Sequence, residues 1–92
     1  MPYIKQERRN DLIGDIENLV YELNDLEGGC TAGDLNYTIT ELLNKAFKLK
    51  ETPSYDKFNT LIGMLECCKL ELYRRQVAIY EDIKIEENGD VF

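Results

Sequence analysis

The sequence predicts an all-α fold: a three-helix antiparallel bundle with a long C-terminal helix and a short extended tail, in one domain that spans residues 1–92. In three separate stretches, apolar residues recur at the three- and four-residue spacing of an amphipathic helix. Two breaks, Gly28-Gly29 and Thr52-Pro53-Ser54, divide these stretches. Ninety-two residues is also the length of a single domain.

The first helix is expected at about residues 8–26. Its apolar residues follow the i, i+3, i+4, i+7 pattern: Leu12, Ile13, Ile16, Leu19, Val20, Leu23 and Leu26. Gly28-Gly29 should end it, because glycine adopts the left-handed conformation after a helix C-terminus without steric cost.

The second helix is expected at about residues 32–50. Thr31 lies three residues before Asp34, the spacing of a capping box at a helix N-terminus. Glu41 and Lys45 form a favourable i, i+4 pair on the solvated side. The stripe expected to be buried is Leu35, Ile39, Leu42, Leu43, Ala46 and Leu49.

The third helix is expected at about residues 54–84 and would be about 45 Å long. Its first half has one clear apolar face, along which Lys69 also lies: Tyr55, Phe58, Leu61, Ile62, Leu65, Cys68, Lys69 and Leu72. Beyond Leu70 the apolar residues fall on several faces, and a helix of that kind is usually covered on several sides. Two shorter helices cannot cover its whole length, so the sequence predicts a homo-oligomer.

The tail, residues 85–92, alternates briefly in polarity around Asn88-Gly89. This dipeptide favours the type I′ turn of a β-hairpin, so the tail is expected to be extended.

The composition argues against several classes of function. The formal net charge is −7, which disfavours general binding to nucleic acid or to an anionic membrane. The chain has no histidine, and its three cysteines match neither a zinc spacing nor a disulfide framework. We therefore expect a protein that is not an enzyme, with no cofactor and no metal. No signal peptide or transmembrane stretch is visible, which favours a cytoplasmic protein with reduced thiols.

The most suggestive polar cluster is Lys69, Tyr73, Arg74 and Arg75 on the third helix. Consecutive arginines beside a tyrosine could hold a phosphate and stack on a base. The alternative is a set of exposed helix ion pairs, because Glu66 precedes Lys69 by three residues and Glu71 precedes Arg74 and Arg75 by three and four.

A second cluster, Asn36 and Tyr37, lies near the start of the second helix, where free N–H groups favour an anion. The alternative is that Asp34 caps this helix and Tyr37 lies at the periphery. Arg8 and Arg9 are possible accessory cations at the start of the first helix, where they oppose the helix dipole.

Three stretches together resemble a family of small, uncharacterised proteins of bacteriophages and prophage-bearing bacteria: MPYIKQE, GDLNYTIT and GMLECCKLELYRRQVAIYEDIKIEENGDV. The resemblance covers essentially the whole chain. It implies a phage setting, and therefore the cytoplasm of a host cell.

Small phage proteins often counter host defence, and some are helical oligomers that sequester nucleotide immune signals. By this analogy we expect an oligomer that binds a small anionic nucleotide. Two alternatives stay open: an acidic inhibitor or adaptor that docks on a host protein, and a component of virion assembly.

Overall fold

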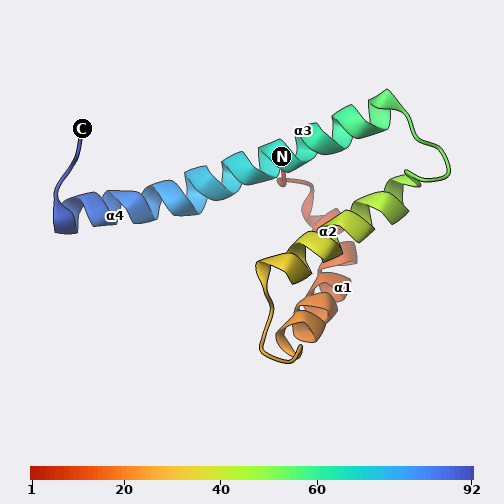
Figure 1. Cartoon of the computed structure of the whole chain (residues 1–92), viewed down its shortest axis with the longest axis horizontal. Coiled ribbons are helices and arrows are strands. Elements are labelled where there is room, and N and C mark those ends of the chain that lie inside the picture. The colour runs from red at the N-terminus through yellow and green to blue at the C-terminus, as the bar shows by residue number, and fades with distance from the viewer. The chain divides into compact units, whose positions relative to one another are not determined.

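The computed structural model describes all 92 residues and is helical throughout, with no strand. The helices are α1 (Gln6–Asn24), α2 (Ala32–Phe47), α3 (Tyr55–Leu72) and α4 (Ala78–Asn88), and the π-helical segment η1 (Tyr73–Val77) joins the last two. Figure 1 shows α3 and α4 as one unbroken ribbon. The prediction of an all-α fold with three helical stretches is confirmed.

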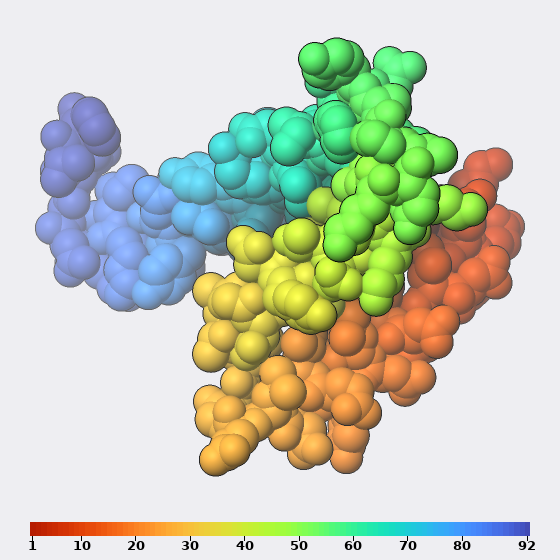
Figure 2. Space-filling view, turned by 45° about the vertical axis from the view of Figure 1, so that its right-hand side comes forward, coloured from red at the N-terminus to blue at the C-terminus, as the bar shows by residue number.

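The chain divides into two compact units, residues 3–58 and residues 1–2 with 59–92. The first unit contains α1 and α2, which lie side by side in Figures 1 and 2. Leu19 of α1 lines one hollow together with Thr38 and Leu42 of α2. The second unit contains most of α3, with η1 and α4.

The loop between α1 and α2 is set by backbone conformation. Gly28 and Gly29 have φ of 80° and 84°, the left-handed region that glycine adopts without a steric penalty. The N–H of Gly29 donates to the carbonyl of Leu26 at 2.8 Å, which tightens the turn. The helix before this turn ends at Asn24, two residues earlier than expected.

A reciprocal capping box starts α2, as its sequence predicts. The N–H of Asp34 donates to Oγ1 of Thr31 at 3.1 Å, and the N–H of Thr31 donates to Oδ2 of Asp34 at 2.8 Å. Hydrogen bonds from the backbone N–H of Thr31 and, to a smaller extent, from its side chain stabilise the ionised form of the Asp34 carboxylate. They lower the pKa of Asp34 below its usual value. The other end of α2 is at Phe47, three residues short of the prediction, and Lys48 follows in the left-handed conformation with φ of 51°.

The third helical stretch is longer than expected at its C-terminal end. Hydrogen bonding continues to the N–H of Gly89, which donates to the carbonyl of Ile85 at 2.8 Å. The expected extended hairpin in residues 85–92 is therefore wrong for 85–88, which are helical. A short hairpin arm needs a partner strand to satisfy its backbone, whereas a helix satisfies its own. Gly89, with φ of 91°, ends a helix instead of turning a hairpin.

Burial is where the structure departs most from expectation. Leu61 is the only buried side chain, at 6% exposure. The apolar stripes read from the sequence, which include Cys68, are mostly exposed, and Cys67 is exposed as well. Exposed members of those stripes include Leu12, Ile13, Ile16, Val20, Leu26, Leu35, Ile39, Leu42, Phe58, Ile62 and Leu72. The helices thus form where predicted, but neither compact unit by itself buries its apolar faces.

The capping box gives the first testable prediction. Replacing Thr31 with alanine removes the acceptor for the N–H of Asp34, and we expect a loss of about 1 kcal/mol in the free energy of unfolding. Urea denaturation followed by circular dichroism measures it. Thr40→Ala is the matched control, because Thr40 lies inside α2, where alanine has the higher helix propensity. Equal destabilisation by both variants would contradict a specific role for the cap.

Candidate functional site

Two of the cations in the cluster predicted on the third helix are held by acidic neighbours on the same helix. Nζ of Lys69 lies 2.9 Å from Oε1 of Glu66. The guanidinium of Arg74 forms a fork with Glu71, with Nε to Oε1 at 3.0 Å and Nη2 to Oε2 at 3.1 Å. The helix ion pairs considered as the alternative from the sequence are therefore present for Lys69 and Arg74.

Tyr73 is joined to Glu81 by a hydrogen bond from its hydroxyl to Oε1, across the π segment. In a continuous α-helix, residues eight apart lie about 80° out of line. The N–H of Ala78 donates to the carbonyl of Tyr73, a π-type bond between residues five apart, so this turn contains about one residue more than an α-helical turn. The eight residues from Tyr73 to Glu81 therefore rotate about as far as seven residues of α-helix. Seven residues bring two side chains within about 20° of each other, so Tyr73 and Glu81 meet on one face.

This bond also governs the titration of Tyr73. The carboxylate of Glu81 accepts a hydrogen bond from the neutral phenol and repels the phenolate, and both effects raise the pKa of Tyr73 above its usual value of 10.0. Tyr73 as a whole residue is 52% exposed.

Arg75 differs from its neighbours. Its side chain makes no hydrogen bond or ion pair within the chain. Glu71 lies four residues before Arg75, but Glu71 pairs with Arg74 instead. A guanidinium without a carboxylate partner keeps its five donors for a ligand, and a phosphate or a carboxylate suits its geometry best.

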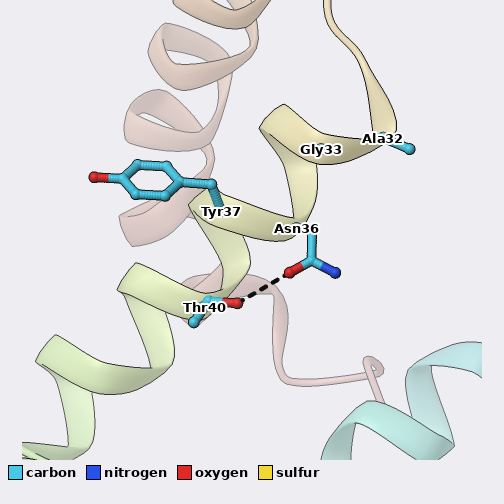
Figure 3. Close-up of a pocket in the computed structure, with 5 residues that line it drawn as sticks. All are labelled: Ala32, Gly33, Asn36, Tyr37 and Thr40. Atoms are coloured by element: carbon cyan, nitrogen blue, oxygen red, sulfur yellow. Dashed lines mark hydrogen bonds between the residues drawn. The ribbon is translucent and has the colours of Figure 1, made fainter.

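Asn36 and Tyr37 line an open hollow of about 580 Å³ at the start of α2, with Ala32, Gly33 and Thr40 (Figure 3). Their side chains do not converge. Oδ1 of Asn36 accepts a hydrogen bond from Oγ1 of Thr40 at 3.3 Å, while the ring of Tyr37 points to the other side of the helix and is 68% exposed.

The capping box makes this end of α2 a poor anion site. Thr31 already satisfies the N–H of Asp34, and the Asp34 carboxylate brings a negative charge to the positive end of the helix dipole. The capping alternative therefore describes this cluster better than an anion cradle. Asn36 and Tyr37 belong to the unit of residues 3–58, whereas Lys69 and Arg75 belong to the other unit.

The two accessory arginines lie in the first turn of α1. Nε of Arg9 donates to the carbonyl of Ile4 at 2.8 Å and so fastens the N-terminal segment to its own helix. Arg8 makes no bond within the chain.

One cluster was missed from the sequence: the lysines at the end of α2. Lys45, Lys48 and Lys50 line an open hollow of about 740 Å³ with Glu41, Asn44, Glu51 and Thr52. Nζ of Lys45 lies 3.2 Å from Oε2 of Glu41, and Lys48 and Lys50 have no partner. The signal in the sequence that could have found this cluster is the recurrence of lysine at positions 45, 48 and 50. A helix C-terminus attracts cations through its dipole, which explains this gathering without a ligand.

No group of three or more cysteine, aspartate or glutamate side chains is placed to hold a metal ion. None of the helices has the length and apolar character needed to cross a membrane.

The fold and these clusters define a small all-helical protein whose polar and apolar groups are presented on open surfaces. The chain belongs to a family known as Domain of unknown function (DUF6899), whose model matches residues 1–91. No curated protein and no solved structure matches the chain.

Tyr73 gives the prediction for this cluster. Since its folded pKa is raised, the Tyr73–Glu81 bond stabilises the helix below pH 10.0 and is lost as the pH rises through the folded pKa. Glu81→Gln should bring the pKa of Tyr73 down towards 10.0. Tyrosinate absorbance during an alkaline titration, with Tyr73→Phe to identify the signal, measures the shift. An unchanged titration in Glu81→Gln would show that the two groups do not interact.

Proposed function

We propose that the protein acts by binding and not by catalysis, as a homo-oligomer in which copies cover one another's apolar helix faces. The observation that supports this most directly is that neither compact unit has a core of its own, since Leu61 is the only buried side chain. The absence of histidine from the chain supports a non-catalytic role, because histidine is the usual acid-base group near neutral pH.

Light scattering at micromolar concentration tests the proposal. We expect a mass that is a multiple of 10.7 kDa, and a thermal midpoint that rises with protein concentration because folding and association are linked. A 10.7 kDa species with a concentration-independent midpoint would contradict the proposal. It would favour the adaptor or inhibitor alternative, in which a different protein covers the helices.

A second candidate function is sequestration of a small nucleotide-type anion, as in a phage protein that counters a host immune signal. The specific observation in its favour is Arg75, which is an arginine without an acidic partner two residues after Tyr73. In this candidate function Arg75 holds a phosphate, Tyr73 stacks on a base, and Arg74 contributes when its pairing with Glu71 relaxes.

Calorimetric titration with cyclic oligonucleotides and ADP-ribose tests the second candidate. Arg75→Gln removes charge-assisted hydrogen bonds worth about 1.5–3 kcal/mol, so we expect affinity to fall by about 10- to 100-fold. Lys84→Gln is the control, because Lys84 pairs with Glu87 at 3.0 Å and lies over Tyr80. No heat from any ligand in the panel, or equal loss in both variants, would contradict the candidate.

A further inference from the structure

We propose that Asn88–Gly89, at the end of α4, is a site of spontaneous deamidation, and that the last turn of the helix sets how fast the reaction runs. Conversion of Asn88 to aspartate or isoaspartate then shortens α4. This inference is independent of the proposed function, because the reaction needs only two neighbouring residues and water.

Asn88 is the one asparagine of this chain that is followed by glycine. The other six precede larger residues: Asn10, Asn18, Asn24, Asn36, Asn44 and Asn59. Deamidation begins when the peptide nitrogen of the next residue attacks the side-chain amide, and a Cβ on that next residue hinders the approach. Glycine has no Cβ, and its backbone reaches conformations that other residues avoid. Asn88 is therefore the asparagine most prone to this reaction.

The reaction needs no reactant other than water. The peptide N–H of Gly89 loses its proton to solvent, and the nitrogen attacks Cγ of Asn88. The new N–Cγ bond closes a cyclic imide, the bond from Cγ to the side-chain nitrogen breaks, and that nitrogen takes a proton from water and leaves as ammonia. Water then opens the imide at either carbonyl. Opening at the main-chain carbonyl gives isoaspartate, and opening at Cγ gives aspartate.

The hydrogen bond at the end of α4 restrains this reaction. Asn88 is the last residue of the helix, and the N–H of Gly89 donates to the carbonyl of Ile85 at 2.8 Å. The bond holds the proton that must leave, and the helical conformation of Asn88 keeps the attacking nitrogen away from its side chain. Both restraints are released when the last turn opens. Because opening is fast compared with the chemistry, the rate follows the open fraction of this turn.

The last turn of α4 is weakly held. It contains no basic residue, although cations are favourable at a helix C-terminus. Glu87 is paired with Lys84 at 3.0 Å, whereas Glu86 has no partner. After Asn88 the chain turns away from the helix axis (Figure 1), and Asn88 and Gly89 line an open hollow of about 310 Å³. The turn can therefore open, and water has access to the reacting atoms.

Conversion makes the helix end less stable still. A carboxylate at position 88 lies at the negative end of the helix dipole, next to Glu86 and Glu87. Isoaspartate has a larger effect, because it adds a methylene group to the main chain and so displaces the N–H of Gly89 from the carbonyl of Ile85. Each converted molecule therefore has a shorter α4 and a longer extended tail.

The chain supplies a matched asparagine as an internal control. Asn24 is the last residue of α1, and the N–H of Asp25 donates to the carbonyl of Tyr21 at 3.0 Å, at the same spacing as the bond from Gly89 to Ile85. Both asparagines thus end a helix and precede a bonded N–H. A difference in conversion between them reports the effect of the residue that follows.

The first experiment ages the natural protein at mildly alkaline pH and follows each asparagine by peptide mass spectrometry. We expect a gain of about 1 Da at Asn88, with aspartate and isoaspartate as separate products, and far less conversion at Asn24. Gly89→Ala should slow the reaction about tenfold or more, because alanine places a Cβ beside the attacking nitrogen. Conversion of Asn88 no faster than that of Asn24 would overturn the proposal.

The second experiment tests the helix end with two substitutions at one position. Glu86→Gly and Glu86→Ala remove the same charge, but glycine favours the helix about fivefold less than alanine. We expect Asn88 to convert about fivefold faster in Glu86→Gly, and faster still when the natural chain is unfolded in urea. Equal rates in the two variants would show that the helix end does not set the rate. Conversion of Asn88 in urea alone would mean that the folded protein closes the site, and the proposal would be wrong.

Hydrogen exchange measures the consequence for α4. Asn88→Asp reproduces the charge of the converted residue, and Asn88→Gln keeps an amide at this position. After correction for intrinsic rates, we expect the Gly89 amide to exchange about two- to fivefold faster in Asn88→Asp, the effect of a negative charge at a helix C-terminus. Equal exchange in the two variants would contradict the shortening of α4.

Discussion

The cost of leaving apolar side chains in water is the constraint on which the rest of this structure depends. Each helix satisfies its own backbone hydrogen bonds, and caps such as the Thr31–Asp34 box secure its ends. Helices of this length are only marginally stable from such local interactions, and most helical stability in proteins comes from packing of an apolar face. Within each of the two compact units that packing is almost absent, because Leu61 alone is buried. This lack of coverage within each unit favours an assembly.

The charged residues that form ion pairs find their partners along the same helical stretch. Glu41 with Lys45, Glu66 with Lys69, Glu71 with Arg74 and Lys84 with Glu87 are all three or four residues apart. Pairs of this kind contribute little to stability when exposed, but they remove cations from the set available to a ligand. Of the cluster predicted from the sequence, which also holds Lys69, Tyr73 and Arg74, only Arg75 has a side chain without a partner in the chain. Arg75 is therefore the clearest candidate in that cluster to bind an external anion.

The π segment connects these two aspects of the molecule. It rotates α4 relative to α3, so that Tyr73 reaches Glu81, and Leu72, Val77 and Tyr80 fall on one side of the helix. Single-turn π segments inside long helices are uncommon and frequently lie at functional sites. Here the segment coincides with YRRQV, the stretch that carries Tyr73, Arg74 and Arg75.

The sequence by itself determined the features that depend on neighbours three or four residues away: the all-α fold, the starts of α2 and α3, the Thr31–Asp34 cap and the Glu41–Lys45 pair. Such interactions are repeated in every helix of the same local pattern, so spacing alone predicts them. Only the tertiary structure decided that Glu71 pairs with Arg74 and leaves Arg75 free, and that a π turn realigns residues 73 and 81. It also decided that neither compact unit covers its own apolar stripes, because burial depends on which elements meet in space, and spacing along one helix does not encode that.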